Sequence, residues 1–214
     1  MNTLARLTLA WLLVAGAAQA QLPSADELAM AVRATAVQAR QAGLALQEGA
    51  LWRIALHHRT PLVAAHVQGI CHLGYSAYTP GRDYRWLFPT LTPALRARWM
   101  AGVVHHELAH CAEQADATSG ADPPAGSAGL QGPRQQEVLA DLAFALHVDA
   151  AHDDDGAALV GQLAHLRTVF AAQDPSHDTA AALRCYLQQR GQFRPAGAWL
   201  AQLQAWRQRC GPVD

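Results

Sequence analysis

The alternation of apolar and polar residues along the chain first predicts a helix near the N-terminus. Leu28 and Val32 recur at helical spacing within residues 24–47, where we expect this helix. Ser24 is placed to cap it, because Glu27 occupies the capping-box position three residues later. The segment therefore predicts a capped amphipathic helix.

The next segment changes to a period of two, which is typical of β-strands. From residue 62 to residue 75, two sets of side chains alternate, and one set is mostly polar, so we expect one or two strands. A turn-rich stretch follows at residues 79–83. Beyond it, Tyr84, Trp86 and Phe88 are expected to resume a strand and to complete a small sheet.

A second helix is predicted from Pro93 onward. Proline is favoured in a first helical turn, and Thr92 precedes it as a capping residue. We expect this helix to reach about Gln114. Residues 115–133 are rich in Gly, Pro, Ser and Ala, and they predict a flexible loop inside one domain.

The C-terminal half is predicted to be helical. Residues 134–151 carry an apolar face, and the acidic segment 152–156 is expected to be a solvated helix end, since it lacks the ligand pattern of a calcium loop. Further helices are expected at about residues 157–172, 179–189 and 195–209. The whole pattern predicts a helix-dominated α+β fold, with a small sheet from about 62 to 88 packed on the helix that starts at Pro93.

Residues 1–20 have the three parts of a secretory signal peptide. Arg6 supplies the positive region, residues 7–15 form an apolar stretch, and residues 18–20 make a small-x-small cleavage site. The apolar stretch is too short to span a bilayer. We therefore expect residues 21–214 to form a single exported domain, periplasmic or secreted, with no transmembrane segment.

The charge of the chain gives no reason to expect nucleic acid or an anionic membrane as a partner. The formal net charge is -1, and loss of the single positive charge of Arg6 with the signal peptide takes it to -2. All basic residues are arginine and alanine is abundant. We interpret this as a genomic composition bias in an exported bacterial protein.

Four cysteines, an even number, fit the oxidising compartment that export implies. Three pairings are possible, and we favour the two that are local in sequence, Cys71 with Cys111 and Cys185 with Cys210. A cysteine-rich metal site is not expected, because the chain has no CxxC or CxH cluster.

Residues 106–110 read His-Glu-Leu-Ala-His, the HExxH pattern. Residues four apart share one face of a helix, so His106 and His110 can bind one metal ion. Neutral imidazole suits zinc, and two histidines leave room for a third ligand and a water. Glu107 is placed to act as general base on that water. His105 points about 100° away and is not expected to bind the metal.

Glu137 is the candidate for the third ligand. It lies four residues before Asp141, so both carboxylates share one helix face. A carboxylate that completes two histidines is a common catalytic zinc set. Asp141 is expected to accept the second ring N–H of a ligand histidine, with His106 as first choice. Glu113, three residues after His110, is the competing third ligand.

HExxH followed by ExxxD on a second helix resembles the gluzincin group of zinc metallopeptidases, which includes thermolysin-like and CAAX-prenyl-protease-like enzymes. The resemblance covers about residues 103–148. It implies a Zn²⁺ ion and a strand before the motif helix, here within residues 62–75, that holds an extended peptide along its edge. The residues that match are His106, His110 and Glu137 as zinc ligands, Glu107 as base, and Asp141 behind a ligand.

The sequence therefore predicts an exported zinc-dependent peptidase that hydrolyses peptide bonds in a peptide or protein substrate. The alternative is a catalytically inactive exported zinc-binding protein or a disulfide-stabilised interaction or assembly protein; the intact Glu107 favours the enzyme. A peptidase also needs a donor for the oxyanion of the attacked carbonyl. The candidates for that donor are His147, His152, His165, His177, Arg184, Tyr186, Tyr75 and Tyr78.

Overall fold

The computed structural model describes residues 23–41, 43–48, 61–76, 88, 90–118 and 132–211. In chain order the elements are α1 (Ala25–Gln41), β1 (Leu46–Glu48), β2 (Leu62–Val67), β3 (Ile70–Tyr75), α3 (Pro93–Thr118), α4 (Pro133–Val148), α5 (Asp154–Phe170), the short 3-10 helix η1 (Pro175–His177), α6 (Ala180–Gln189) and α7 (Trp199–Cys210). The predicted helix-dominated α+β fold is confirmed.

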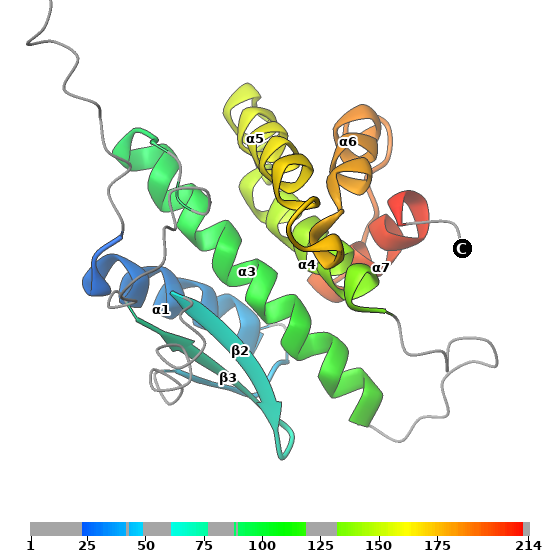
Figure 1. Ribbon diagram of the computed structural model, residues 1–214. Helices are drawn as coiled ribbons and strands as arrows, with labels where there is room; N and C mark the ends of the chain where they lie inside the picture. Colours follow the sequence, from blue (N-terminus) through cyan, green and yellow to red (C-terminus); the bar gives the residue numbers. More distant parts are fainter. Residues whose placement is uncertain are drawn as a thin grey trace, which may run out of the picture.

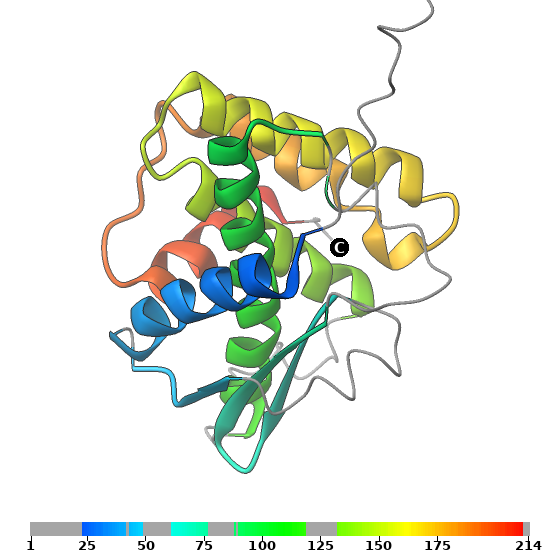
Figure 2. The same cartoon turned by 90° about the vertical axis from the view of Figure 1, so that its left-hand side faces the viewer.

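Helix α3 is the central element of the fold (Figure 1). Helix α1 and the sheet lie on one side of it, and α4 to α7 lie on the other, as the side view in Figure 2 also shows. Its side chains Trp99, Val104 and Leu108 are almost fully buried in the core, together with Phe144 of α4. The predicted packing of the sheet on the motif helix is therefore confirmed.

The sheet has the strand order β1-β3-β2, so that among the described residues β2 pairs with a strand on one side only. Strands β2 and β3 form an antiparallel hairpin, and Gln68 and Gly69 in its turn have φ values of 51° and 81°, as a two-residue primed turn requires. The N–H of Ser76 donates to the carbonyl of Pro61 at 2.8 Å. Because ladder bonds alternate along a strand, the backbone of Ala64 faces away from β3.

The start of α1 follows the predicted capping box. The N–H of Ser24 donates to the Glu27 carboxylate (N···O 2.7 Å), and the N–H of Glu27 donates to the Ser24 hydroxyl (3.1 Å). The predicted end at about residue 47 is wrong. Gly43, with φ of 87°, donates to the carbonyl of Arg40 and closes the helix in a Schellman motif.

Strand β1 follows this cap and was missed in the sequence. It pairs in parallel with β3, with Leu46 opposite Cys71. The prediction that Tyr84 and Trp86 resume a strand lies outside the described residues, and Phe88 is buried. The described sheet therefore contains β2 and β3 within the predicted range and one additional strand, β1, from earlier in the chain.

The boundaries of several later helices differ from prediction by a few residues. The Thr92 hydroxyl accepts from the N–H of Leu95 (3.4 Å), as expected of a cap, but α3 runs past Gln114 to Thr118. The acidic segment 152–156 begins a helix rather than ending one, because the Asp153 carboxylate accepts from the N–H of Gly156. Helices α4 and α7 are shorter than predicted at their C-terminal and N-terminal ends respectively.

Both favoured disulfides are present. Cys71–Cys111 joins β3 to α3, and Cys185–Cys210 joins α6 to α7. Within the described ranges no helix has the length and apolar character needed to cross a membrane. The predicted signal peptide lies outside the described residues.

Candidate metal centre

The two helices that carry the candidate ligands cross at a glycine. A Cβ atom on Gly102 would lie 2.6 Å from Val148 and 2.7 Å from Phe144, both on α4. Only a residue without a side chain allows α3 and α4 to approach this closely. His106 follows one turn later on α3, so the close crossing brings the HExxH face against α4.

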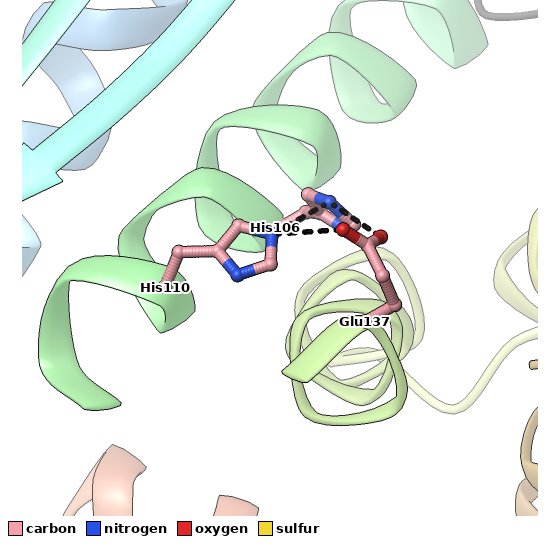
Figure 3. Close-up of side chains that lie close together, drawn as sticks. All are labelled: His106, His110 and Glu137. Carbon is pink, nitrogen blue, oxygen red and sulfur yellow. Dashed lines mark hydrogen bonds and ion pairs between the residues drawn. The ribbon is translucent and has the colours of Figure 1, made fainter. Parts of the chain in front are cut away.

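His106, His110 and Glu137 come together between these helices (Figure 3). The two Nε2 atoms are 3.3 Å apart. Nε2 of His106 lies 3.5 Å from Oε2 of Glu137, and Nε2 of His110 lies 3.5 Å from Oε1. Among the described residues this is a group of side chains that could hold one metal ion.

Asp141 lies behind the group and is completely buried. Its Oδ1 lies 3.0 Å from Nδ1 of His106, the contact anticipated from the sequence. Arg167 of α5 donates to both oxygens of Asp141, at 2.6 and 2.7 Å, and the Thr179 hydroxyl donates to Oδ2. This carboxylate therefore fixes the orientation of the His106 ring from a position that is itself held by α5 and by the start of α6.

Burial and these charges shift the pKa values of the two histidines in opposite directions. Burial disfavours the charged form of His106, but the hydrogen bond with Asp141 and the charges of Glu137 and Asp141 outweigh it and raise its pKa. Burial and the neighbouring His106 lower the pKa of His110 to about 4. Although Asp141 is buried, Arg167 and His106 hold its pKa well below the usual range. His110 therefore has the neutral form that binds a metal, whereas the neighbouring carboxylates favour the protonated form of His106, with which a metal ion competes.

Glu107 faces the strand side of α3. Burial and the charge of Glu137 raise the pKa of its carboxyl group, and the charge of His106 and a hydrogen bond from the backbone of Ala64 on β2 partly oppose the rise. A carboxyl group with a raised pKa suits proton transfer near neutral pH. The edge strand therefore contacts the predicted base through its main chain.

Glu137 has two further neighbours. The guanidinium of Arg167 lies 3.4 Å from its Oε2, and Nε2 of His177 lies 3.4 Å from the same oxygen. His177 is at the end of η1, where its Nδ1 lies 3.0 Å from Asp174 and 3.2 Å from the Ser176 hydroxyl. Of the candidate oxyanion donors that the structure describes, His177 is thus the one with a contact to a metal-site residue.

The remaining candidates among the described residues do not belong to the metal-capable group. Glu113 is not in the metal-capable group, and its charge acts on Arg207 of α7. Four of the other candidate donors contact residues outside the metal site: His147 stacks on His105, Tyr186 donates to Asp149, His152 lies 3.6 Å from Asp149, and Arg184 donates to Thr168. His165 is exposed, and Tyr75 is partly buried on β3. Tyr78 lies outside the described residues.

Arg167 and Thr179 were missed in the sequence. Arg167 falls on the buried stripe of α5 that also contains Val160, Leu163 and Ala164. A charged residue at an apolar position of a helix needs a buried partner, and this was the available signal. Thr179 carried no comparable signal.

No protein-family model and no curated protein matches this sequence, and no solved structure matches its fold. The gluzincin resemblance therefore remains a hypothesis that rests on the motifs and on the geometry of the site.

Proposed function

We propose that the protein is an exported zinc-dependent peptidase with the metal held by His106, His110 and Glu137. The observation that carries this proposal is the spacing of the three donor groups. Ligand atoms at about 2.0–2.1 Å from a tetrahedral zinc ion lie roughly 3.3–3.4 Å from one another. The two Nε2 atoms are 3.3 Å apart, which agrees with that spacing, and each lies 3.5 Å from one oxygen of the Glu137 carboxylate.

The chemistry of the donor set also favours zinc. Two imidazoles and one carboxylate form a catalytic zinc set with a position left for water or substrate. The Asp141 carboxylate behind His106 is the support that zinc-binding histidines usually have. A zinc ion held there supplies Lewis acidity toward a substrate carbonyl and a nearby water.

In this proposal Glu107 transfers the protons, and His177 is the hydrogen-bond donor for the oxyanion. Glu107, next to the first ligand, takes a proton from the attacking water and passes it to the leaving amine. His177 donates toward the oxyanion that develops on the attacked carbonyl. Its ring is already oriented for this by Asp174 on the opposite nitrogen.

A peptide or protein substrate is supported by the position of β2. This strand is at the edge of the sheet that the described residues form, and the backbone of Ala64 faces away from β3 and contacts Glu107. An extended peptide that pairs along this edge would place a scissile bond near the base. Two disulfides support export to an oxidising compartment.

The first experiment measures zinc per molecule on disulfide-bonded protein that was purified without a histidine tag. We expect about one zinc ion, peptide-library cleavage by the wild type, and a zinc-loaded but inactive Glu107→Gln variant. Failure to take up zinc would overturn the proposal. Bound zinc with no cleavage of any peptide would instead support the inactive binding or assembly protein.

A further inference from the structure

One face of α4 contacts three consecutive residues of the segment that joins α5 to α6. This face carries three charged side chains at helical spacing, and each has a partner among residues 177–179. The pairs are Arg134 with Asp178, Glu137 with His177, and Asp141 with Thr179. The helix face that serves the candidate metal centre is therefore also the face on which this segment is held.

Arg134 binds Asp178 at two points. Its Nε donates to the backbone carbonyl of Asp178 at 2.8 Å, and its Nη2 lies 3.2 Å from Oδ2 of the same residue. A residue held through its carbonyl and its side chain cannot rotate about its own backbone without breaking one of these bonds. Asp178 directly follows His177, so Arg134 fixes the direction in which the chain leaves His177.

We propose that Arg134 is a positioning residue that keeps His177 beside the candidate metal centre. The contacts of the His177 ring with Asp174 and Ser176 lie within its own turn, so they would move together with it. Its contact with α4 is the one between Nε2 and Oε2 of Glu137, at 3.4 Å. Arg134 ties the next residue to the same helix, one turn before Glu137. This inference rests on the proposed function, in which His177 donates to the oxyanion, and adds the residue that sets the place of that donor.

The exposure of this pair makes it suitable for mutation. The side chains of Arg134 and Asp178 are 47% and 50% exposed, and exposed ion pairs contribute little to the stability of a fold. Arg134→Met should therefore leave the fold intact. The matched control is Arg40→Met on the other side of α3: Arg40 is 48% exposed and also binds one carbonyl, of Leu46, and one carboxylate, of Glu48.

The test combines a measure of proximity with kinetics on the full disulfide-bonded chain. The nuclear Overhauser effect between the His177 ring and the Glu137 side chain should weaken severalfold in Arg134→Met, because fewer molecules keep the ring in place. In the zinc-loaded protein kcat should fall by about three- to tenfold with KM nearly unchanged, since an oxyanion donor acts in the transition state. Arg40→Met should match the wild type in both measurements.

A double-mutant cycle shows whether Arg134 acts through His177. His177→Gln alone is expected to lower kcat by about 100-fold. If Arg134 acts by placing His177, adding Arg134→Met to His177→Gln lowers kcat no further. The same fall in kcat in both backgrounds would overturn the inference, because Arg134 would then act independently of His177.

The two measurements separate this inference from the proposed function, because the Overhauser effect needs neither a bound metal nor a substrate. If the effect is absent from the wild type, or if it is as strong in Arg134→Met as in the wild type, the role of Arg134 is overturned whatever the activity. If it weakens in Arg134→Met but the wild type cleaves no peptide, the placement of His177 by Arg134 is supported and the proposed function is overturned.

Discussion

Nδ1 of His106 lies 3.0 Å from Oδ1 of Asp141, and this contact joins α3 to α4 across the candidate metal centre. The same buried carboxylate accepts from Arg167 and Thr179. One side chain thus both orients a ligand and ties α5 and α6 to the centre. Metal affinity and fold stability should therefore depend on the same residue.

Asp141→Asn is expected to weaken zinc binding by about 10- to 100-fold, because His106 loses a charged acceptor for its second ring nitrogen. The NH₂ group of the introduced side chain would also face an N–H group of Arg167, where a carboxylate oxygen now accepts. We therefore expect the free energy of unfolding to fall by about 3–5 kcal/mol. Competition with a chromophoric chelator measures the affinity, and urea titration measures the stability.

Asp149→Asn is the matched control for that experiment. Asp149 is equally buried and accepts from Arg190 and Tyr186, but it has no contact with the candidate ligands among the interactions described. We expect a comparable loss of stability with unchanged zinc affinity. Equal effects of both variants on zinc would show that Asp141 acts only through the fold.

Ala64→Pro tests the main-chain contact of the predicted base. The substitution removes the N–H that faces Glu107 and leaves the ladder bonds of β2 to β3 intact. We expect the pKa of Glu107 to rise and the acid limb of the activity profile to move to higher pH by roughly one unit. Ala64→Gly keeps the N–H and should leave the acid limb of the activity profile where it is. If the acid limb of Ala64→Pro also stayed in place, the contact between Ala64 and Glu107 would not influence the pKa of Glu107.

Gly102→Ala tests the helix crossing. The added methyl group would overlap Val148 and Phe144, so we expect a loss of about 1–3 kcal/mol in the free energy of unfolding, together with weaker zinc binding. Gly161→Ala on α5 is the control, because its nearest neighbour would be 4.0 Å away. That variant should gain about 0.5–1 kcal/mol. If Gly102→Ala left the free energy of unfolding and the zinc affinity unchanged, α3 and α4 would tolerate a wider separation.

Much of the candidate site was predictable because its signals are local. The HExxH spacing, the Glu137–Asp141 spacing and the Ser24–Glu27 box each lie within one helical turn. Strand β1 was not predictable in the same way, since three residues show no alternation and the strand depends on pairing with β3. Asp153 was placed at the wrong helix end because two helix ends are only a few residues apart there.

His147 is expected to make the fold sensitive to acid. Burial and the His105 ring stacked on it at 3.8 Å lower the pKa of His147 to about 3. In the unfolded chain the pKa is about 6.5, so the unfolded state binds a proton that the folded state excludes. The contribution of His147 to the free energy of unfolding is complete above about pH 6.5. It is lost as the pH falls toward about 3, by at most about 1.4 kcal/mol per pH unit.

Urea unfolding at about pH 7 and about pH 5 measures this dependence. His147→Gln should lose less stability than the wild type over this interval, because its side chain does not titrate. His165→Gln replaces an exposed histidine of α5 and should behave as the wild type does. Equal losses in wild type and His147→Gln would exclude His147 as the cause.

The Cys71–Cys111 bond closes a covalent ring in the chain, with a sequence separation of 40 between its two cysteines. His106, Glu107 and His110 all lie inside this ring. A single backbone cut anywhere between the two cysteines would therefore leave both fragments attached to each other. Such a nicked molecule would separate only after reduction, so the ring keeps β3 and α3 joined after a proteolytic cut between the two cysteines.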